Sequence, residues 1–380
     1  MSYPTEKLKS LSFIKTGKLD SNAANANGAY PFFTCDPNTL RINNWAYDTE
    51  AVLLAGNNAN GNYTAKYYSG KFNAYQRVYI IETADAKRLN IRFLCYAINQ
   101  QLHLLKKMSS GSTTKFLTLG MLHGLDIPLP AIEIQEGVVN ILSSYDDFIE
   151  NNQKQIKLLE EAAQRLYKEW FVDFRFPGHE NVKIMDGVPE GWRTVKLSDV
   201  ANVNKACISE HYPYDYVDYV DLGSVSRGYI EAITRISVQD APSRAKRLAF
   251  DGDIIWGMVR PNLKSYALVL HPSETSVYST GFAVLSAQKV PFSFLYCCVT
   301  QDDFVSYLVN CTNGAAYPAI KPDHFKEAAI TLPTDSLLRQ FNLIAEPMYR
   351  KIEILEKQIK QSKEARDRLL PKLMNREIEV

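Results

Sequence analysis

The chain has 380 residues, and its 43 Lys and Arg residues nearly balance its 42 Asp and Glu residues, giving a formal net charge of +1. This balance argues against a protein that coats nucleic acid without selectivity, so any phosphate contact must come from local patches. The six cysteines have no CxxC spacing and the apolar runs are short, which argues against a zinc ribbon, a disulfide framework and a membrane span. Because the first residues also lack the apolar block of a secretory signal, we expect a reduced, cytoplasmic protein.

The first predicted domain covers residues 1–112. Strand-like runs at residues 30–34, 51–55 and 77–81 alternate with turn-rich loops, and residues 91–105 have helical spacing. We therefore expect a mixed α/β domain in which the sheet dominates.

A segment rich in Asn, Lys and Tyr lies between two of these strands, at residues 56–77. Asn can bond to adenine through two atoms, Lys and Arg reach phosphates or guanine, and Tyr stacks or contacts phosphate. A solvated hairpin with turn-forming Asn and Gly is the alternative interpretation. The candidate DNA-binding residues in this segment are Asn57, Asn58, Asn60, Tyr63, Lys66, Tyr67, Lys71, Asn73, Tyr75 and Arg77.

A long helix at about residues 134–174 is predicted within the first spacer region, residues 113–183. Apolar residues recur there at alternating steps of four and three, which is the heptad pattern by which one helix buries a narrow seam against another. The seam consists of Val138, Leu142, Tyr145, Ile149, Asn152, Ile156, Leu159, Ala163, Leu166 and Trp170.

The chain then repeats itself, with a second domain at residues 184–315 and a second spacer region at residues 316–380, whose helix is predicted at about 335–375. Eleven of the thirty residues from 141 to 170 are identical to the residue 203 positions later. Since a shared heptad period does not require identical surface residues, this match indicates an internal duplication. The second seam consists of Phe341, Ala345, Met348, Ile352, Leu355, Ile359, Ser362, Arg366, Leu369 and Leu373.

The duplication extends beyond the helices. Each helix is preceded by an Ile-x-Leu-Pro segment, at residues 127–130 and 330–333, and residues 46–52 align with residues 249–255 at the same offset. The loops differ, however, because the second domain has the sequence GMVRPNLKSYA where the first has its Asn-rich segment. Loops that diverge on a common scaffold are typical of specificity. The candidates in the second domain are Arg260, Asn262, Lys264 and Tyr266.

Three polar residues, Asn152, Ser362 and Arg366, occupy seam positions. Polar groups in a seam cost stability but penalise slipped pairings, so they favour one fixed register. The alternative is that these positions lie open where the helices splay apart.

No catalytic motif is present. The two pairs of glycines with phosphate-loop spacing are not followed by Lys and Ser or Thr, and there is no HExxH sequence. The glycine motif of an S-adenosylmethionine site and the Asn-or-Asp-Pro-Pro-aromatic motif of an adenine methyltransferase are also missing. We therefore predict neither catalytic residues nor a metal site, and take the six histidines as structural.

The first helix closes with RLYKEWFVDF at residues 165–174, and the second domain opens with PEGW at residues 189–192. Together with the alternating domains, the paired helices and the Ile-x-Leu-Pro segments, these sequences resemble the specificity subunit of type I restriction-modification systems. The resemblance covers essentially the whole chain. It implies that each domain is a target-recognition domain reading one half of a bipartite DNA site. It also implies methyltransferase and restriction subunits as partners, which would supply S-adenosylmethionine, ATP and Mg²⁺.

The expected fold is α+β. Two tandem sheet-dominated target-recognition domains alternate with two long helices, which pair as an antiparallel coiled coil under pseudo-two-fold symmetry. A 33-residue seam is roughly 50 Å long, so the domains would read half-sites separated by an unread spacer. The alternatives are a coiled-coil adaptor whose domains bind proteins and, less favoured, a self-sufficient methyltransferase.

Overall fold

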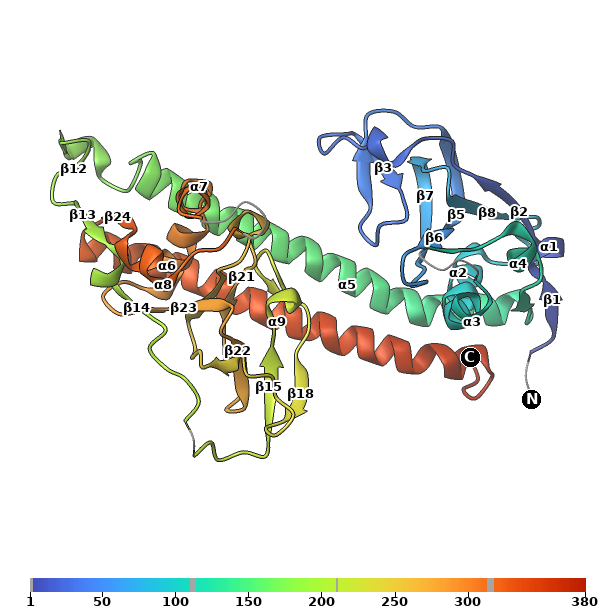
Figure 1. Cartoon of the computed structure of the whole chain (residues 1–380). Helices are drawn as coiled ribbons and strands as arrows, with labels where there is room; N and C mark the ends of the chain where they lie inside the picture. Colours follow the sequence, from blue (N-terminus) through green and yellow to red (C-terminus); the bar gives the residue numbers. More distant parts are fainter. Residues whose placement is uncertain (1–2, 110–113, 210, 313–317) are drawn as a thin grey trace. The chain divides into compact units, whose positions relative to one another are not determined.

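The computed structural model describes residues 3–109, 114–209, 211–312 and 318–380 (Figure 1). The predicted domain boundaries at 112/113 and 315/316 lie outside the described residues. The chain divides into two compact units, and each contains part of both long helices. Unit 1 comprises residues 1–151 and 358–380, and unit 2 comprises residues 152–357.

The two long helices are α5 (Ile132–Tyr167) and α9 (Asp335–Met374). Proline precedes each of them, at Pro130 and Pro333, where it blocks helical extension upstream. A π-helical turn, η2 (Lys168–Val172), continues α5 before Phe174 adopts a left-handed φ of 58°. No described helix combines the length and the apolar character needed to cross a membrane.

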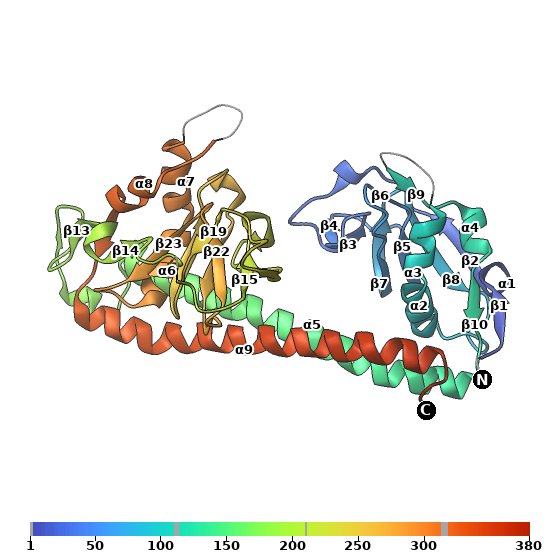
Figure 2. The same ribbon diagram turned by 60° about the horizontal axis from the view of Figure 1, so that its bottom comes forward.

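Segments of α5 and α9 run antiparallel within each unit. In unit 1, Val138 near the start of α5 shares a core with Leu373 near the end of α9, and Arg366 donates to Asp146 at 2.6 Å. In unit 2, the order is reversed, since the Phe171 ring lies 5.1 Å from the Phe341 ring. The ribbons of Figures 1 and 2 show the same pairing of the two helices within each unit. The predicted antiparallel coiled coil is confirmed.

Most apolar seam residues are buried, as the narrow stripe between two helices requires. The polar seam residue Asn152 is only 2% exposed, and Arg366 is partly buried and paired with Asp146. Asn152 is therefore shielded from solvent, and Arg366 is partly shielded. The buried seam residues are Val138, Leu142, Ile149, Ala163, Trp170, Phe341, Ala345, Ile352, Leu355, Ile359 and Leu373, and the partly buried ones include Ile156, Leu159, Leu166, Met348 and Leu369.

Unit 1 is built on a six-stranded sheet in the order β2-β8-β5-β7-β3-β4. Side chains of the central strand alternate, so that Val52 and Leu54 face helix α2 while Ala51 and Leu53 face away. The strands are β2 (Ser12–Thr16), β8 (Val78–Thr83), β5 (Tyr47–Ala55), β7 (Ala65–Ala74), β3 (Tyr30–Phe33) and β4 (Leu40–Ile42). Two short strands, β6 (Asn57–Asn58) and β9 (Lys115–Phe116), pair beside it.

Two helices replace the single helix predicted at residues 91–105. Helix α2 (Ile91–Gln100) begins at Asn90, whose side chain accepts hydrogen bonds from the backbone of Arg92 and Phe93. The chain leaves helical geometry at Gln101 and continues as α3 (Leu102–Met108). The shorter helices α1 (Leu8–Leu11) and α4 (Leu119–His123) complete this unit.

Unit 2 repeats the first four strands in the order β14-β23-β20-β21 and adds a second sheet in the order β18-β15-β22-β19. The first sheet contains β14 (Ala201–Val203), β23 (Phe282–Ala287), β20 (Asp253–Gly257) and β21 (Tyr266–Val269). The second contains β18 (Thr234–Ser237), β15 (Tyr216–Val220), β22 (Ser276–Ser279) and β19 (Ala245–Arg247). Its helices besides the long ones are α6 (Phe292–Thr300), α7 (Asp302–Asn310) and α8 (Pro322–Glu327).

A two-stranded antiparallel pair leads into each long helix. In unit 1 it consists of β1 (Thr5–Lys7) and β10 (Asp126–Pro128), and in unit 2 of β13 (Arg193–Lys196) and β24 (Ala329–Leu332). Two small hairpins also occur, formed by β11 (Ile184–Met185) with β12 (Val188–Pro189) and by β16 (Val225–Ser226) with β17 (Tyr229–Ile230). The predicted duplication of domain and helix is therefore present in the fold.

The offset of 203 places the central strands one residue out of register. Val52 faces α2, but Ile255, 203 positions later, faces the second sheet, and Ile254 faces α6 instead. A slip of one residue reverses every side chain in a strand, so Val52 corresponds to Ile254. The sequence alignment could not detect this slip because apolar residues occupy both faces of the buried strand.

Candidate nucleic-acid interface

The ten candidates of the first domain divide by exposure. Asn60, Lys71 and Arg77 are exposed, whereas Tyr63 and Asn73 are only 5% and 4% exposed. The candidates Asn57, Asn58, Lys66, Tyr67 and Tyr75 are partly buried. The exposed side chains are the ones that can reach a ligand without rearrangement.

Two of the asparagines support the loop itself. The Asn58 side chain accepts hydrogen bonds from the backbone nitrogens of Asn60 and Asn62, at 2.9 and 3.1 Å. The Asn73 side chain accepts from the Ala74 nitrogen at 3.0 Å. Both contacts are local side chain to backbone bonds, made by Asn58 in a turn and by the buried Asn73 at the end of β7, so these two residues have structural roles.

The two exposed cationic candidates of the first domain lie over aromatic rings. Lys71 Nζ lies 4.7 Å from the centre of the Trp45 ring, and the Arg77 guanidinium lies 5.9 Å from that of Phe116. Trp45 and Phe116 are 43% and 38% exposed. Exposed rings beside cations can stack on bases or sugars while the cation meets a phosphate. Sequence reasoning missed both rings, although the Asn-Asn-Trp sequence at residues 43–45 already places a tryptophan in a turn-forming context.

Lys66 is held more tightly than these residues. Its Nζ donates to Thr39 Oγ1 at 3.1 Å, and burial lowers the pKa of its ammonium group. Tyr67 is also engaged, since its hydroxyl donates to Glu50 Oε1 at 2.5 Å. These two side chains are better placed to fix the strand than to read a base.

The candidates of the second domain lie in and beside the short helix η6 (Pro261–Leu263). Arg260 and Asn262 are exposed, and Tyr266 is only 4% exposed. Lys264 Nζ is paired with Asp302 Oδ1 at 2.6 Å, and this hydrogen bond lowers the pKa of Asp302. Arg260 and Asn262 thus remain as the exposed polar side chains among these four.

The backbone of this loop is strained. Arg260 and Lys264 have φ values of 50° and 56°, in the left-handed region that costs a residue with a side chain free energy. The Arg260 nitrogen donates to the Pro318 carbonyl at 2.8 Å, which helps to hold the conformation. Such strain is typical of functional loops, because only the surrounding contacts keep it in place.

The hairpin that carries η6 is fastened at its opposite end to α9. Strands β20 and β21 form the hairpin, with η6 between them; Asp251 precedes β20 and His271 follows β21. The His271 nitrogen donates to Asp251 Oδ1 at 2.8 Å, closing that end of the hairpin.

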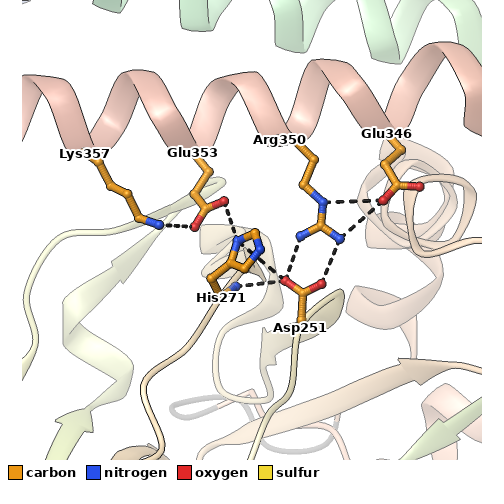
Figure 3. Close-up of polar contacts among 6 residues, drawn as sticks. All are labelled: Asp251, His271, Glu346, Arg350, Glu353 and Lys357. Atoms are coloured by element: carbon orange, nitrogen blue, oxygen red, sulfur yellow. Dashed lines mark hydrogen bonds and ion pairs between the residues drawn. The ribbon is translucent and has the colours of Figure 1, made fainter.

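Two side chains of α9, those of Arg350 and Glu353, bind these two residues (Figure 3). Arg350 donates to both oxygens of Asp251, each at 2.7 Å, and also bonds to Glu346 on its own helix. Glu353 Oε2 lies 2.8 Å from His271 Nδ1, while its other oxygen accepts from Lys357. This paired geometry is the strong form of a charged contact, so the network fixes the orientation of the hairpin on the helix.

Replacing Arg350 by Met should destabilise the chain by about 1 kcal/mol, a modest value because the pair is partly exposed and screened. The Arg350 hydrogen bonds lower the pKa of Asp251 to about 2, below its value of about 3.9 in an unfolded chain. The stabilisation is therefore complete above about pH 5 and is lost as the pH falls from about 4 towards 2. Urea unfolding of both proteins across this range measures the difference.

Arg339→Met is the matched control, since Arg339 is an exposed arginine of the same helix. It should leave the free energy of unfolding within about 0.5 kcal/mol of the parent protein at every pH. If the free energy of unfolding differs between Arg350→Met and the parent protein by the same amount from pH 5 to pH 2, the ion pair with Asp251 does not have the assigned role.

Within the described part of the chain, no group of three or more His, Cys, Asp or Glu residues is arranged to hold a metal ion. The geometry instead consists of exposed Asn, Lys and Arg side chains on strand β7 and on the loops and turns of the two hairpins.

Comparison with known proteins shows which proteins this scaffold resembles. The family model described as the type I restriction modification DNA specificity domain matches residues 3–161. The EcoDI specificity subunit of a type I restriction enzyme from Escherichia coli is 27% identical over 390 residues, covering 94% of this chain and 84% of that protein. The MjaIX specificity subunit from Methanocaldococcus jannaschii is 28% identical over 286 residues, covering 73% of this chain and 66% of that protein.

The same architecture occurs in a solved structure, the S subunit of a type I restriction-modification system from M. genitalium. Its TM-score is 0.65 at 16% identity, covering 98% of this chain and 96% of that one. The fold is therefore shared along nearly the whole length. In its repeated residue pattern, its architecture and these matches, the chain is similar over most of its length to the specificity subunits of type I restriction-modification systems.

Proposed function

We propose that this chain selects the DNA target of a type I restriction-modification complex, reading a bipartite site with one domain for each half-site. The observation that carries the proposal is the repeated scaffold with different exposed polar side chains in and beside the equivalent hairpins β5–β7 and β20–β21. The first domain presents Asn60, Lys71 and Arg77, and the second presents Arg260 and Asn262. These residue types recognise base edges and phosphates.

The long helices account for an unread spacer between the half-sites. Helix α5 has 36 residues and rises roughly 54 Å, which corresponds to about one and a half turns of duplex at 34 Å per turn. The first domain precedes α5 in the chain and the second follows it, so each domain can read its own half-site while the intervening base pairs go unread.

The chemistry of the complex belongs, in this proposal, to other chains. Methyltransferase subunits bind S-adenosylmethionine and modify the site, and restriction subunits use ATP and Mg²⁺. This chain directs both to the DNA in the cytoplasm. Its own contribution is the choice of sequence, and hence the positions at which the complex acts.

Sequencing the modified bases in cells that express the chain with its methyltransferase subunit tests the proposal. We expect one methylated motif with two short specific halves and a gap of constant length. Exchange of residues 56–77 for the corresponding loop of a relative should change one half of the motif and preserve the other. A motif that is continuous, or that does not change with either domain, excludes the bipartite division.

Salt dependence separates the proposal from the alternative of a coiled-coil adaptor that binds proteins. With about six to ten phosphate contacts, a plot of log affinity for duplex DNA against log salt should have a slope of roughly −5 to −9. Lys71→Gln should reduce this slope by about one if Lys71 meets a phosphate. Binding of the assembled complex that is indifferent to salt favours the adaptor.

A further inference from the structure

Unit 1 contains a cavity of about 540 Å³ between strand β7 and helices α2, α5 and α9. Sites for small molecules usually measure about 300 to 1,000 Å³, so the cavity has the volume of a ligand site. Its walls come entirely from unit 1, and it is separate from the exposed loop residues proposed to read DNA.

The corresponding place in unit 2 is filled by three tyrosines. Ala65 opens β7 and Tyr266 opens β21, the equivalent strand of the repeat. Cys95 and Tyr296 both follow a Phe-Leu pair, on α2 and α6 respectively. The third pair is Asp146 on α5 and Tyr349 on α9, which differ by the repeat offset of 203.

These tyrosines form a buried aromatic cluster. The Tyr296 ring lies 6.2 Å from that of Tyr266 and 5.2 Å from that of Tyr349, and the three side chains are 7%, 4% and 4% exposed. In unit 1, a methyl, a thiol and a carboxylate stand in their place. The cavity is therefore the volume that three rings occupy in the second repeat.

The framework around this volume is preserved in both units. Tyr96 of α2 donates to Asp146 of α5 at 2.5 Å, and in unit 2 the Cys297 thiol of α6 lies 2.9 Å from the Tyr349 hydroxyl of α9. The same two helices are thus linked at the same level in each repeat. The small residues of unit 1 open a space without removing the contact that holds its walls.

The cavity has acidic walls and two internal cations. Four carboxylates line it, from Asp146, Asp147, Glu150 and Asp367, against the guanidinium groups of Arg92 and Arg366. The four negative charges exceed the two positive ones by two. Arg366 is bound by Asp146 and Asp367, and Arg92 lies 4.5 Å from the centre of the Tyr67 ring. This excess favours a cation and opposes an anion.

Asp147 is the carboxylate best placed to receive that cation. It is exposed and its charge acts on Arg92, whereas Asp146 and Asp367 both accept hydrogen bonds from Arg366. The cavity already accommodates planar cations of its own, since Arg366 is clasped between carboxylates and Arg92 stacks on a ring. Carboxylates bind a planar cation through two parallel bonds, and aromatic faces attract it.

We propose that this cavity is a binding site for a planar organic cation, a guanidinium or amidinium group attached to a flat or short substituent. The group would lie against Tyr67 and Tyr96 and reach Asp147, in the space that phenol rings fill in unit 2. Either a free small molecule or an arginine side chain of a partner protein carries this chemistry. An occupant there bridges the sheet of the first domain to both long helices.

Titration of benzamidine into the full-length chain, followed by calorimetry, tests the site. Benzamidine is a flat ring with an amidinium group, and benzamide and benzoate are its neutral and anionic counterparts. We expect one saturable site for benzamidine and no binding of the other two. The proposal is overturned if benzamidine does not bind at about 10 mM, a concentration that would reveal even a very weak site. It is also overturned if all three compounds bind with equal affinity.

Two variants assign the binding to this cavity. Asp147→Asn should lower the affinity for benzamidine at least about ten-fold. Glu136→Gln replaces an exposed carboxylate of the same helix outside the cavity, and it should leave this affinity unchanged. The double replacement of Ala65 and Cys95 by Tyr installs the side chains of unit 2 and should abolish binding. Undiminished binding by Asp147→Asn contradicts the site even if the double variant fails to fold.

The same titration on the chain purified with its partner subunits distinguishes the two sources. Benzamidine that binds the isolated chain but not the assembly indicates that a partner side chain occupies the cavity. Binding to both indicates a free small molecule. Because these titrations contain no DNA, a negative result leaves the proposed recognition of DNA untouched.

Discussion

Removal of one heptad from each long helix, residues 152–158 of α5 and 354–360 of α9, should shorten the unread spacer of the methylated motif by about three base pairs. Seven residues of helix rise about 10 Å, and a base pair of duplex rises about 3.4 Å. Seven residues also amount to nearly two full helical turns, so the seam keeps its facing positions. The altered motif is read by sequencing the modified bases in cells that contain the variant complex.

Total methylation by this variant should also fall. Three base pairs turn the duplex by about 100°, whereas the shortened helices turn by only about 20°, so the two half-sites no longer face the domains equally well. Deletion from α5 alone is the control, and it should destabilise the chain because the seam residues of α9 lose their partners. Retention of the original gap by the doubly shortened variant refutes the role of the helices in measuring the site.

Replacing Arg260 by Ala should cost about 1 to 3 kcal/mol of binding free energy and relax the choice of base at one position of one half-site. Arg260 is exposed, and its backbone is held in a left-handed conformation beside η6. Its guanidinium offers a planar pair of donors that matches the two acceptors on the edge of guanine. Selection of bound sequences from a library randomised in both half-sites measures the change.

Arg260→Lys is the matched variant, because it keeps the charge and loses the planar pair of donors. It should make the choice of base at the same position less strict, while the dependence of binding on salt should not change. If Arg260→Ala instead weakens binding equally on every sequence and lowers the salt slope by about one, Arg260 contacts a phosphate. Unaltered preference in the other half-site is expected in either case.

The Arg350 network and the loop at Arg260 are the two ends of one hairpin, and this arrangement explains how a strained loop keeps its shape. Asp251 and His271 are fixed to α9, and strands β20 and β21 carry this constraint to η6. Residues whose own conformations are locked by packing and hydrogen bonds hold a site more accurately than free loops do. Sequence inspection does not identify the pair, since Asp251 and Arg350 lie 99 positions apart.

The choice of candidate residues shows where reasoning from residue type reaches its limit. The Asn, Lys and Tyr content of residues 56–77 identified a polar loop, but Tyr63 and Asn73 lie inside the fold. Asn58 acts in the turn that was the alternative interpretation of this segment. Composition describes what a segment can do, whereas burial depends on residues that approach from elsewhere in the chain.

The sequence alone determined the duplication, the long helices and their antiparallel seam, because helical periodicity and a constant offset are properties of neighbouring positions along the chain. The tertiary structure decided the one-residue slip between Val52 and Ile254, the break at Gln101 and the cavity that Ala65, Cys95 and Asp146 leave open in unit 1. Each of these depends on packing between segments distant in sequence. Side-chain volume and strand register are settled only when the opposing surface is present.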